Sequence, residues 1–205
     1  GSGSRSRSSG RRARRAARCF SASSGSEANR IQVTDNDAHD NGSTGINVSS
    51  AVTVQRNRAY NQSVGIYSYN ANSLVEDNDA WNNTIGIQTG YQGWIIGNRS
   101  FDNGTGISTY YSSNISRNQV YSNSTGISDA GYSEIFNNLV YANTNVGIYV
   151  TYSHVAGDRT VYNNTVWQDT GDAIRVTGTS NIRVRNNLLS IGNGYALNVE
   201  TSGQS

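Results

Sequence analysis

One asparagine recurs at a nearly constant interval through most of this chain. Its positions are Asn36, Asn57, Asn78, Asn98, Asn118, Asn138, Asn164 and Asn187, with successive gaps of 21, 21, 20, 20, 20, 26 and 23 residues. A β-branched apolar residue stands three positions before each Asn, and a Gly-Ile pair or a variant of it follows farther on. A fixed period of this length is typical of stacked supersecondary units, so the repeat constrains the fold more than any other feature.

Each repeat contains short runs in which apolar residues alternate, such as Ile31-x-Val33 and Ile46-x-Val48. This is the period of a half-buried strand, and Gly, Asn and Ser separate the runs. Two or three strands in 20-odd residues make one turn of a parallel β-helix. The sequence therefore predicts an all-β, single-stranded solenoid of about eight coils of 20–26 residues, occupying residues 29–202.

Stacking coils about 4.8 Å apart would place equivalent residues above one another in columns. The recurring Asn is then predicted to form a structural ladder of buried amides. A second ladder is predicted at Asn41, Asn83, Asn103, Asn123 and Asn143. An aromatic column is predicted at His39, Tyr60, Trp81, Phe101, Tyr121, Tyr141 and Trp167.

Charged residues flank the ladder Asn with alternating sign. Asp35, Arg56 and Asp77 precede it, and Asp37, Arg58, Asp79 and Arg99 follow it. Calcium needs several converging oxygen ligands, whereas here each acid has an Arg one coil away. We therefore expect ion pairs rather than a metal site, and no cofactor; calcium belongs only to the enzymatic alternative given below.

Composition separates residues 1–28 from the rest of the chain. This segment is rich in Arg, Ser and Gly and lacks the repeat, so it is predicted to be disordered or to form a short capping helix. No apolar stretch follows its basic run, so no signal peptide is expected. From residue 19 onward, nine arginines face fourteen acidic residues, a net charge of −5. The body is thus a poor candidate for binding nucleic acid, and nothing suggests a membrane span. With no Met, the chain is expected to be part of a longer polypeptide.

The spacing Asn-x-Ala/Val-aromatic-x-Asn followed by Gly-Ile resembles the right-handed parallel β-helix repeats of pectate-lyase-like proteins, over roughly residues 29–200. The segment Asp35–Gly42 is most similar to one coil of the mannuronan C5-epimerases. That family carries an Asp-Pro-His-Glu motif about one strand earlier, where this chain reads Ser23–Ser26, and a further Asp where it has Ser49. The resemblance thus implies the fold without the catalytic set.

Tyrosines supply the candidate binding surface. Tyr67, Tyr69, Tyr110 and Tyr149 are expected to point outward from the Gly-Ile strand, with Tyr91, Tyr111, Tyr132 and Tyr152 just beyond it. Rings with hydroxyls suit sugar rings, although mutual stacking along a strand would explain them as well. We therefore predict a bacterial, secreted or cell-surface domain that binds or presents itself to polysaccharide.

Two alternatives stay open. One is a uronan-processing enzyme, a polysaccharide lyase or an epimerase, and the other is a purely structural stalk. Candidate catalytic residues are His154, Asp158 and Arg159 in the irregular 26-residue repeat, and His39 in the first coil. The sequence places these candidate catalytic side chains in separate columns, which argues against an enzyme.

Overall fold

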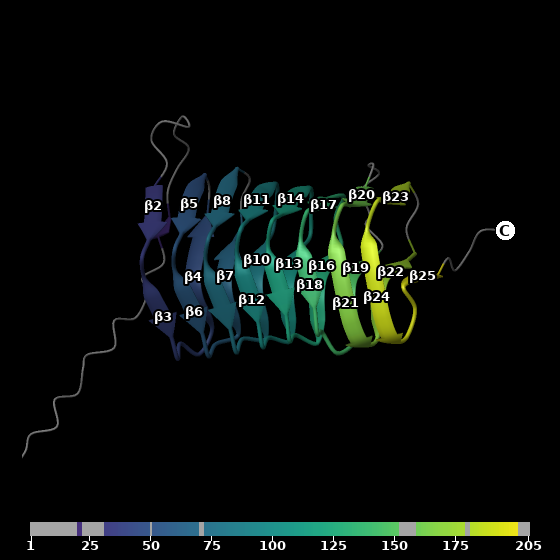
Figure 1. Cartoon of the computed structure of the whole chain (residues 1–205). Helices are drawn as coiled ribbons and strands as arrows, with labels where there is room; N and C mark the ends of the chain where they lie inside the picture. Colours follow the sequence, from purple (N-terminus) through teal and green to yellow (C-terminus); the bar gives the residue numbers. More distant parts are fainter. Residues whose placement is uncertain are drawn as a thin grey trace, which may run out of the picture.

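In a computed structural model of the chain, described for residues 20–21, 31–49, 51–69, 72–151, 159–178 and 181–200, every regular element is a β-strand. The strands form three parallel sheets, and each strand pairs with its equivalents in the preceding and following coils. Figure 1 shows the coils stacked in chain order along one axis. The molecule is a right-handed parallel β-helix of about eight coils, which confirms the predicted fold class.

Each coil contributes one strand to each sheet. Sheet A contains β1 (Phe20–Ser21), β4 (Thr44–Ser49), β7 (Val64–Ser68), β10 (Ile85–Thr89), β13 (Thr105–Thr109), β16 (Thr125–Asp129), β19 (Val146–Val150), β22 (Asp172–Thr177) and β25 (Leu197–Glu200). Sheet B contains β2 (Ile31–Thr34), β5 (Val52–Gln55), β8 (Ser73–Glu76), β11 (Gly93–Ile96), β14 (Ser113–Ser116), β17 (Glu134–Phe136), β20 (Arg159–Tyr162) and β23 (Ile182–Arg185). Sheet C contains β3 (Asp37–His39), β6 (Arg58–Tyr60), β9 (Asp79–Trp81), β12 (Arg99–Phe101), β15 (Gln119–Tyr121), β18 (Leu139–Tyr141), β21 (Thr165–Thr170) and β24 (Leu188–Asn193).

The corner between sheets B and C is made by one residue in the left-handed backbone conformation. Its φ angle lies between 53° and 68° in every coil, at Asp35, Arg56, Asp77, Gly97, Arg117, Asn137, Asn163 and Asn186. Gly, Asn and Asp adopt this conformation at low cost, which explains most of the residues found there. The ladder Asn follows immediately, so its side chain is aimed into the corner.

These Asn side chains form a hydrogen-bonded ladder along the axis. The Oδ1 atom of Asn78 accepts from the backbone N–H of Asn57 at 2.9 Å and from its side-chain amide at 3.0 Å. The Nδ2 atom of Asn78 donates to the carbonyls of Val54 and Glu76, both at 2.9 Å. The same side-chain bond links each Asn to the next from Asn36 to Asn187. Each buried amide therefore finds partners, as buried polar groups must.

The core is a thin column of aliphatic side chains enclosed by the three sheets. In register, Ile66, Ile87, Ile107, Ile127, Ile148 and Ile174 stack one above another and are fully buried. The equivalent Leu197 in the last coil is 45% exposed because no described coil covers it. Since the strands in each sheet are parallel and each coil contributes one of them, each residue packs against the equivalent residues of the neighbouring coils.

One short segment of the predicted leader, residues 1–28, forms a β-strand of the solenoid. Phe20–Ser21, within the segment assigned to the leader, forms β1 and pairs with Val48 and Ser49 of β4. The remainder of residues 1–28 lies outside the described residues. Within the described part of the chain, no segment is a helix with the length and hydropathy that crossing a membrane requires.

Candidate functional site

The tyrosine surface lies on sheet A and on the corner that leads from it to sheet B. Tyr67 in β7 and Tyr149 in β19 occupy the same outward column, four coils apart. Tyr69 and Tyr110 come directly after the ends of β7 and β13, so they lie at the start of the corner, one residue beyond the strand to which they were assigned. Tyr91, Tyr111 and Tyr132 follow farther into the same corner, and Tyr152 lies outside the described residues.

Four of these rings form a continuous series across neighbouring coils. Ring centroids are 6.0 Å apart for Tyr67 and Tyr69, 5.7 Å for Tyr69 and Tyr91, and 4.6 Å for Tyr91 and Tyr111. Tyr91 and Tyr111 are parallel within 6°, whereas Tyr69 meets Tyr91 edge-on. Burial, with further contributions from the nearby Tyr69 and Tyr110 hydroxyls, raises the pKa of the Tyr67 hydroxyl. The rings thus pack against one another and still present a surface.

Exposure is concentrated in three tyrosines of this surface. Tyr69, Tyr91 and Tyr110 are 48%, 40% and 49% exposed. Gly90 makes room for Tyr69, because a Cβ atom at Gly90 would lie 2.6 Å from the Tyr69 carbonyl oxygen and 3.2 Å from its ring. Tyr149 is more enclosed, and its hydroxyl is 2.9 Å from that of Thr177. The accessible part of the surface is therefore the corner, and the strand itself contributes less.

His39 heads the aromatic column on the outer face of sheet C. Its ring stacks on Tyr60 at 4.9 Å, and the series continues through Trp81, Phe101, Tyr121 and Tyr141. The His39 Nδ1 atom is 2.8 Å from an Asp40 carboxylate oxygen. This arrangement shows the predicted column and gives His39 a packing role beside its one acidic neighbour.

Arg159 lies inside the solenoid. It begins β20 on the inward face of sheet B, and only 2% of its surface is exposed. Its Nη1 atom donates to the Thr151 carbonyl at 3.3 Å, and burial lowers the pKa of its guanidinium, opposed by the charge of Asp129. His39 is on the outside of a different sheet, and His154 and Asp158 lie outside the described residues. The described candidates for catalysis are therefore not brought together.

A buried polar cluster around Asp129 was not anticipated from the sequence. Asp129 is 1% exposed and accepts hydrogen bonds from the hydroxyls of Thr109 at 2.7 Å and Ser133 at 2.8 Å, and from the backbone N–H of Gly131 at 3.0 Å. The signal was available: small polar residues replace aliphatic ones at inward positions of these coils. The Ser133 hydroxyl also lies 3.2 Å from the Tyr111 carbonyl oxygen, so the cluster contacts the backbone of the tyrosine corner.

The charged residues beside the Asn ladder form ion pairs between coils. Arg56 donates to both carboxylate oxygens of Asp35, at 2.9 and 3.0 Å. Arg58 bonds to Asp37 at 2.6 Å and Arg99 to Asp79 at 2.7 Å. The guanidinium of Arg56 lowers the pKa of the Asp35 carboxyl. These carboxylates already have cationic partners, so they are poorly disposed to collect a calcium ion.

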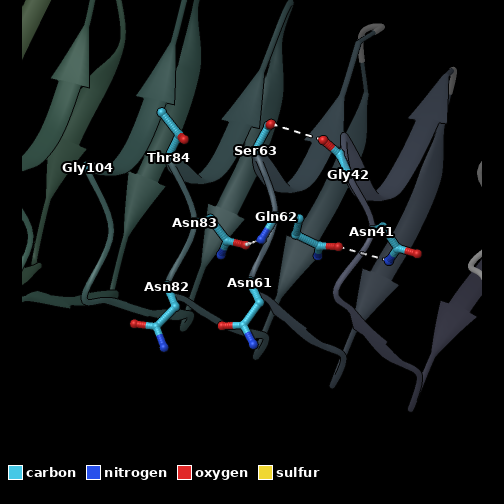
Figure 2. Close-up of a pocket in the computed structure, with 9 residues that line it drawn as sticks. All are labelled: Asn41, Gly42, Asn61, Gln62, Ser63, Asn82, Asn83, Thr84 and Gly104. Atoms are coloured by element: carbon cyan, nitrogen blue, oxygen red, sulfur yellow. Dashed lines mark hydrogen bonds between the residues drawn. The ribbon is translucent and has the colours of Figure 1, made fainter. Parts of the chain in front are cut away.

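A polar groove of about 630 Å³ runs along the corner between sheets C and A. Figure 2 shows Gln62 and Asn83 in the second amide ladder, while Asn61 and Asn82 point away from it. Asn41 donates to Gln62 at 2.9 Å, and the backbone N–H of Gln62 donates to Asn83 at 3.2 Å. Gln62, and Gln168 farther along, therefore fill rungs that the sequence pattern left out. The groove offers a row of amides and no charged side chain among its lining residues.

Comparison with protein families supplies a relationship for this repeat. The model of one family, described as periplasmic copper-binding protein (NosD), matches residues 8–155 and again residues 128–205. The chain belongs to the NosD family. This membership agrees with the β-helix described above and with the repeated match along the chain. A comparison with curated individual proteins finds no match.

Solved structures share the NosD-family fold of this chain. The A-module of the mannuronan C-5 epimerase AlgE6 from Azotobacter vinelandii superposes with a TM-score of 0.68 at 18% identity, covering 86% of this chain and 56% of that one. XylC, in a complex with xylose, superposes with a TM-score of 0.53 at 11% identity, covering 78% of this chain and 47% of that one. The chain thus spans about half the length of these proteins, and likeness at such identity shows the fold alone.

The family description raises the question of copper. Copper sites are built from Cys, Met and His ligands, and the whole sequence has no Met, one Cys and two His. Across the described ranges, no three His, Cys, Asp or Glu residues gather closely enough to hold a metal ion. His39 is paired with Asp40 in that part of the chain and has no soft ligand beside it. The described residues therefore do not fit a copper site.

Proposed function

We propose that this NosD-family β-helix is a polysaccharide-binding module that works outside the cytoplasm. The observation that carries the proposal is the row of tyrosine rings on the corner of sheet A, three of which are between 40% and 49% exposed. Tyrosine combines a flat apolar face with a hydroxyl, which matches a sugar ring with its C–H face and its hydroxyl rim. The description of the family as periplasmic supports the location.

The geometry favours a polymer over a small ligand. Tyr69 and Tyr110 lie two coils apart in one column, with Gly90 between them, and their backbone N–H groups bond to Val48 and Thr89 of the preceding coils. Two coils correspond to about 10 Å, roughly the repeat of two sugar units along an extended chain. Rings spaced along the axis can thus contact successive units of one strand of polysaccharide.

Mutual packing of the rings bears on the structural alternative. Tyr67, Tyr69, Tyr91 and Tyr111 contact one another, as a stalk that binds no ligand would also require. The exposure of the rings favours a binding surface over a stalk, because mutual packing alone gives no reason to leave Tyr69 and Tyr110 about half accessible. A test must therefore change the exposed rings and measure binding and stability separately.

The experiment is a screen of the chain against acidic and neutral glycans, followed by titration of the best binder. Tyr69→Ala and Tyr110→Ala should each weaken binding a few-fold, since an aromatic contact contributes about 0.5–1.5 kcal/mol. The double variant should nearly abolish binding while its thermal midpoint stays close to that of the parent. Trp167→Ala is the matched control, because Trp167 is also exposed, at 52%, but lies on sheet C.

Two results would overturn the proposal. One is the absence of saturable binding to any glycan by the parent chain. The other is a double variant that binds as the parent does. If the double variant unfolds instead, the rings are holding the corner together and the structural stalk becomes the function that fits.

A further inference from the structure

The outer face of sheet B carries a hollow that belongs to none of the surfaces described above. It has a volume of about 370 Å³ and opens across three successive strands, β11, β14 and β17. In register, Ser116 stands between Ile96 and Phe136, and Asn114 stands between Trp94 and Glu134. Two small polar side chains thus interrupt columns of large ones, and the interruption is the hollow, which we call the sheet B slot.

The slot has the thickness of one coil. Beyond it, the column that contains Ser116 is filled by stacked rings: Phe136 and Tyr162 are 5.1 Å apart and parallel within 4°, and the Arg185 guanidinium lies 5.2 Å from the Tyr162 ring centre. A ring placed at the level of Ser116 would stand about one coil spacing, roughly 5 Å, from Phe136. It would have Ile96 on its other face, so it would continue a stack that the protein already builds.

The rim of the slot provides a cation. Arg117 lines it, is exposed and has a φ of 57°, and its neighbours in the corner column are the uncharged Gly97 and Asn137. Three described arginines nearer the N-terminus, Arg56, Arg58 and Arg99, are each paired with an Asp one coil away. In the part of the chain that the structure describes, Arg117 has no such acidic partner. A guanidinium at this place can take a carboxylate through charge-assisted hydrogen bonds.

We propose that the sheet B slot binds a planar aromatic ring that carries a carboxylate. The ring would enter over Ser116 between Ile96 and Phe136, with Trp94 also lining the slot, and the carboxylate would point to Arg117. Ser116 lies at the floor of the slot and is 4% exposed, and its hydroxyl forms no hydrogen bond within the described residues, so a polar substituent would reach it only from a ring seated in the slot. A flat ring suits the slot because both of its faces would be covered at the spacing of the existing stack.

The probe is 4-hydroxybenzoate, and the readout is the indole N–H resonance of Trp94. Of the three tryptophans in the chain, Trp81 and Trp167 lie on sheet C and serve as internal controls. The probe should shift the Trp94 resonance saturably and leave the other two in place. Three further compounds serve as controls: the neutral amide of the probe tests the charge, cyclohexanecarboxylate tests the flat ring, and galacturonate tests a sugar acid. Each should bind at least about tenfold more weakly than the probe.

Two variants separate the slot from the rest of the fold. Ser116→Phe should fill the slot with the missing ring, keep the thermal midpoint and abolish the shift of Trp94. Arg117→Asn keeps a residue that accepts the left-handed conformation, as Asn137 does one coil later, and should weaken the probe by about tenfold. The Tyr69/Tyr110 double variant should bind the probe like the parent, since the two tyrosines lie on the corner from sheet A to sheet B and not in the sheet B slot.

The proposal is overturned by any of four results. The first is a Trp94 resonance that does not respond, and the second is a folded Ser116→Phe variant that binds normally. The third is binding of the neutral amide, cyclohexanecarboxylate or galacturonate as tight as that of the probe. The fourth is loss of probe binding in the folded Tyr69/Tyr110 variant. If Ser116→Phe fails to fold, the Arg117→Asn variant provides the test. An unchanged affinity of this variant for the probe contradicts the proposal, and a tenfold loss of affinity supports it.

Discussion

The residue that organises this molecule is a short amide placed directly after a left-handed corner. Its Oδ1 atom accepts two hydrogen bonds from the preceding coil, and its Nδ2 atom donates to backbone carbonyls and to the next rung. A carboxylate at this place would set like charges one coil apart, and a hydroxyl would lack the second donor. Only an amide closes the pattern repeatedly at this spacing.

The ladder yields a prediction at its centre. Asn98→Ala should lower the free energy of unfolding by about 1–3 kcal/mol, because the backbone N–H and the side-chain amide of Asn78 both lose the Asn98 acceptor. Chemical denaturation measures the loss. Gln119→Ala, an exposed polar change one coil away, is the control. Equal midpoints for the two variants would contradict the role assigned to the amides.

At the scale of the element, the three sheets share one core and carry different outer faces. Sheet A leads to the tyrosine surface, sheet B carries the slot, and sheet C carries the stacked aromatic column headed by His39. The inward faces resemble one another because each column must fill the same narrow interior. The outward faces are free to differ, so binding is argued from them.

A pH dependence is expected where β22 meets the last coil. Burial by itself raises the pKa of Asp172, but hydrogen bonds from Asn198, from Arg175 and from the Tyr195 backbone N–H outweigh it and hold the pKa below its ordinary value of 3.8. A carboxyl whose pKa is lowered by folding stabilises the protein above the unfolded-state pKa. Stability should therefore fall as the pH drops below about 4 and through the lower folded-state pKa.

Thermal unfolding between neutral and acidic pH tests this expectation. Asp172→Asn should be less stable than the parent at neutral pH and should show a smaller loss on acidification. Asp169→Asn, an exposed position in the neighbouring strand β21, should behave like the parent. A parent and an Asp172→Asn variant with identical acid profiles would show that these hydrogen bonds contribute nothing.

At the scale of the whole molecule, the solenoid is nearly one-dimensional. Strands pair only with their equivalents in adjacent coils. The free energy of unfolding is therefore close to a sum of contributions from the individual coils and from the interfaces between neighbouring coils. The last described coil exposes Leu188, Tyr195 and Val199 at 67%, 65% and 54%, which shows how much each coil depends on a neighbour to cover it.

This repetition predicts that one coil can be removed in register. Deleting residues 99–118 joins Asn98 to Gln119, which places β15 where β12 was and β16 where β13 was. The shortened chain should keep its β circular-dichroism spectrum and a cooperative transition, with a smaller denaturant dependence because less surface is exposed on unfolding. Deleting residues 99–108 alone, which removes half a coil, should abolish the transition. Equal tolerance of both deletions would contradict a register set by whole coils.

The sequence by itself determined the β-helix, its number of coils, the rungs of Asn and the ion pairs between Asp35 and Arg56 and their equivalents. These follow from the period, because residues one repeat apart must lie one coil apart. The cross-section of a coil is not contained in the period. Only the tertiary structure decided that Arg159 and Asp129 face the interior, that Tyr69 and Tyr110 stand past the strand ends, and that Ser116 opens a slot. Each of these depends on where the corners turn and on the size of side chains in neighbouring columns, and burial and exposure are properties of that packed arrangement.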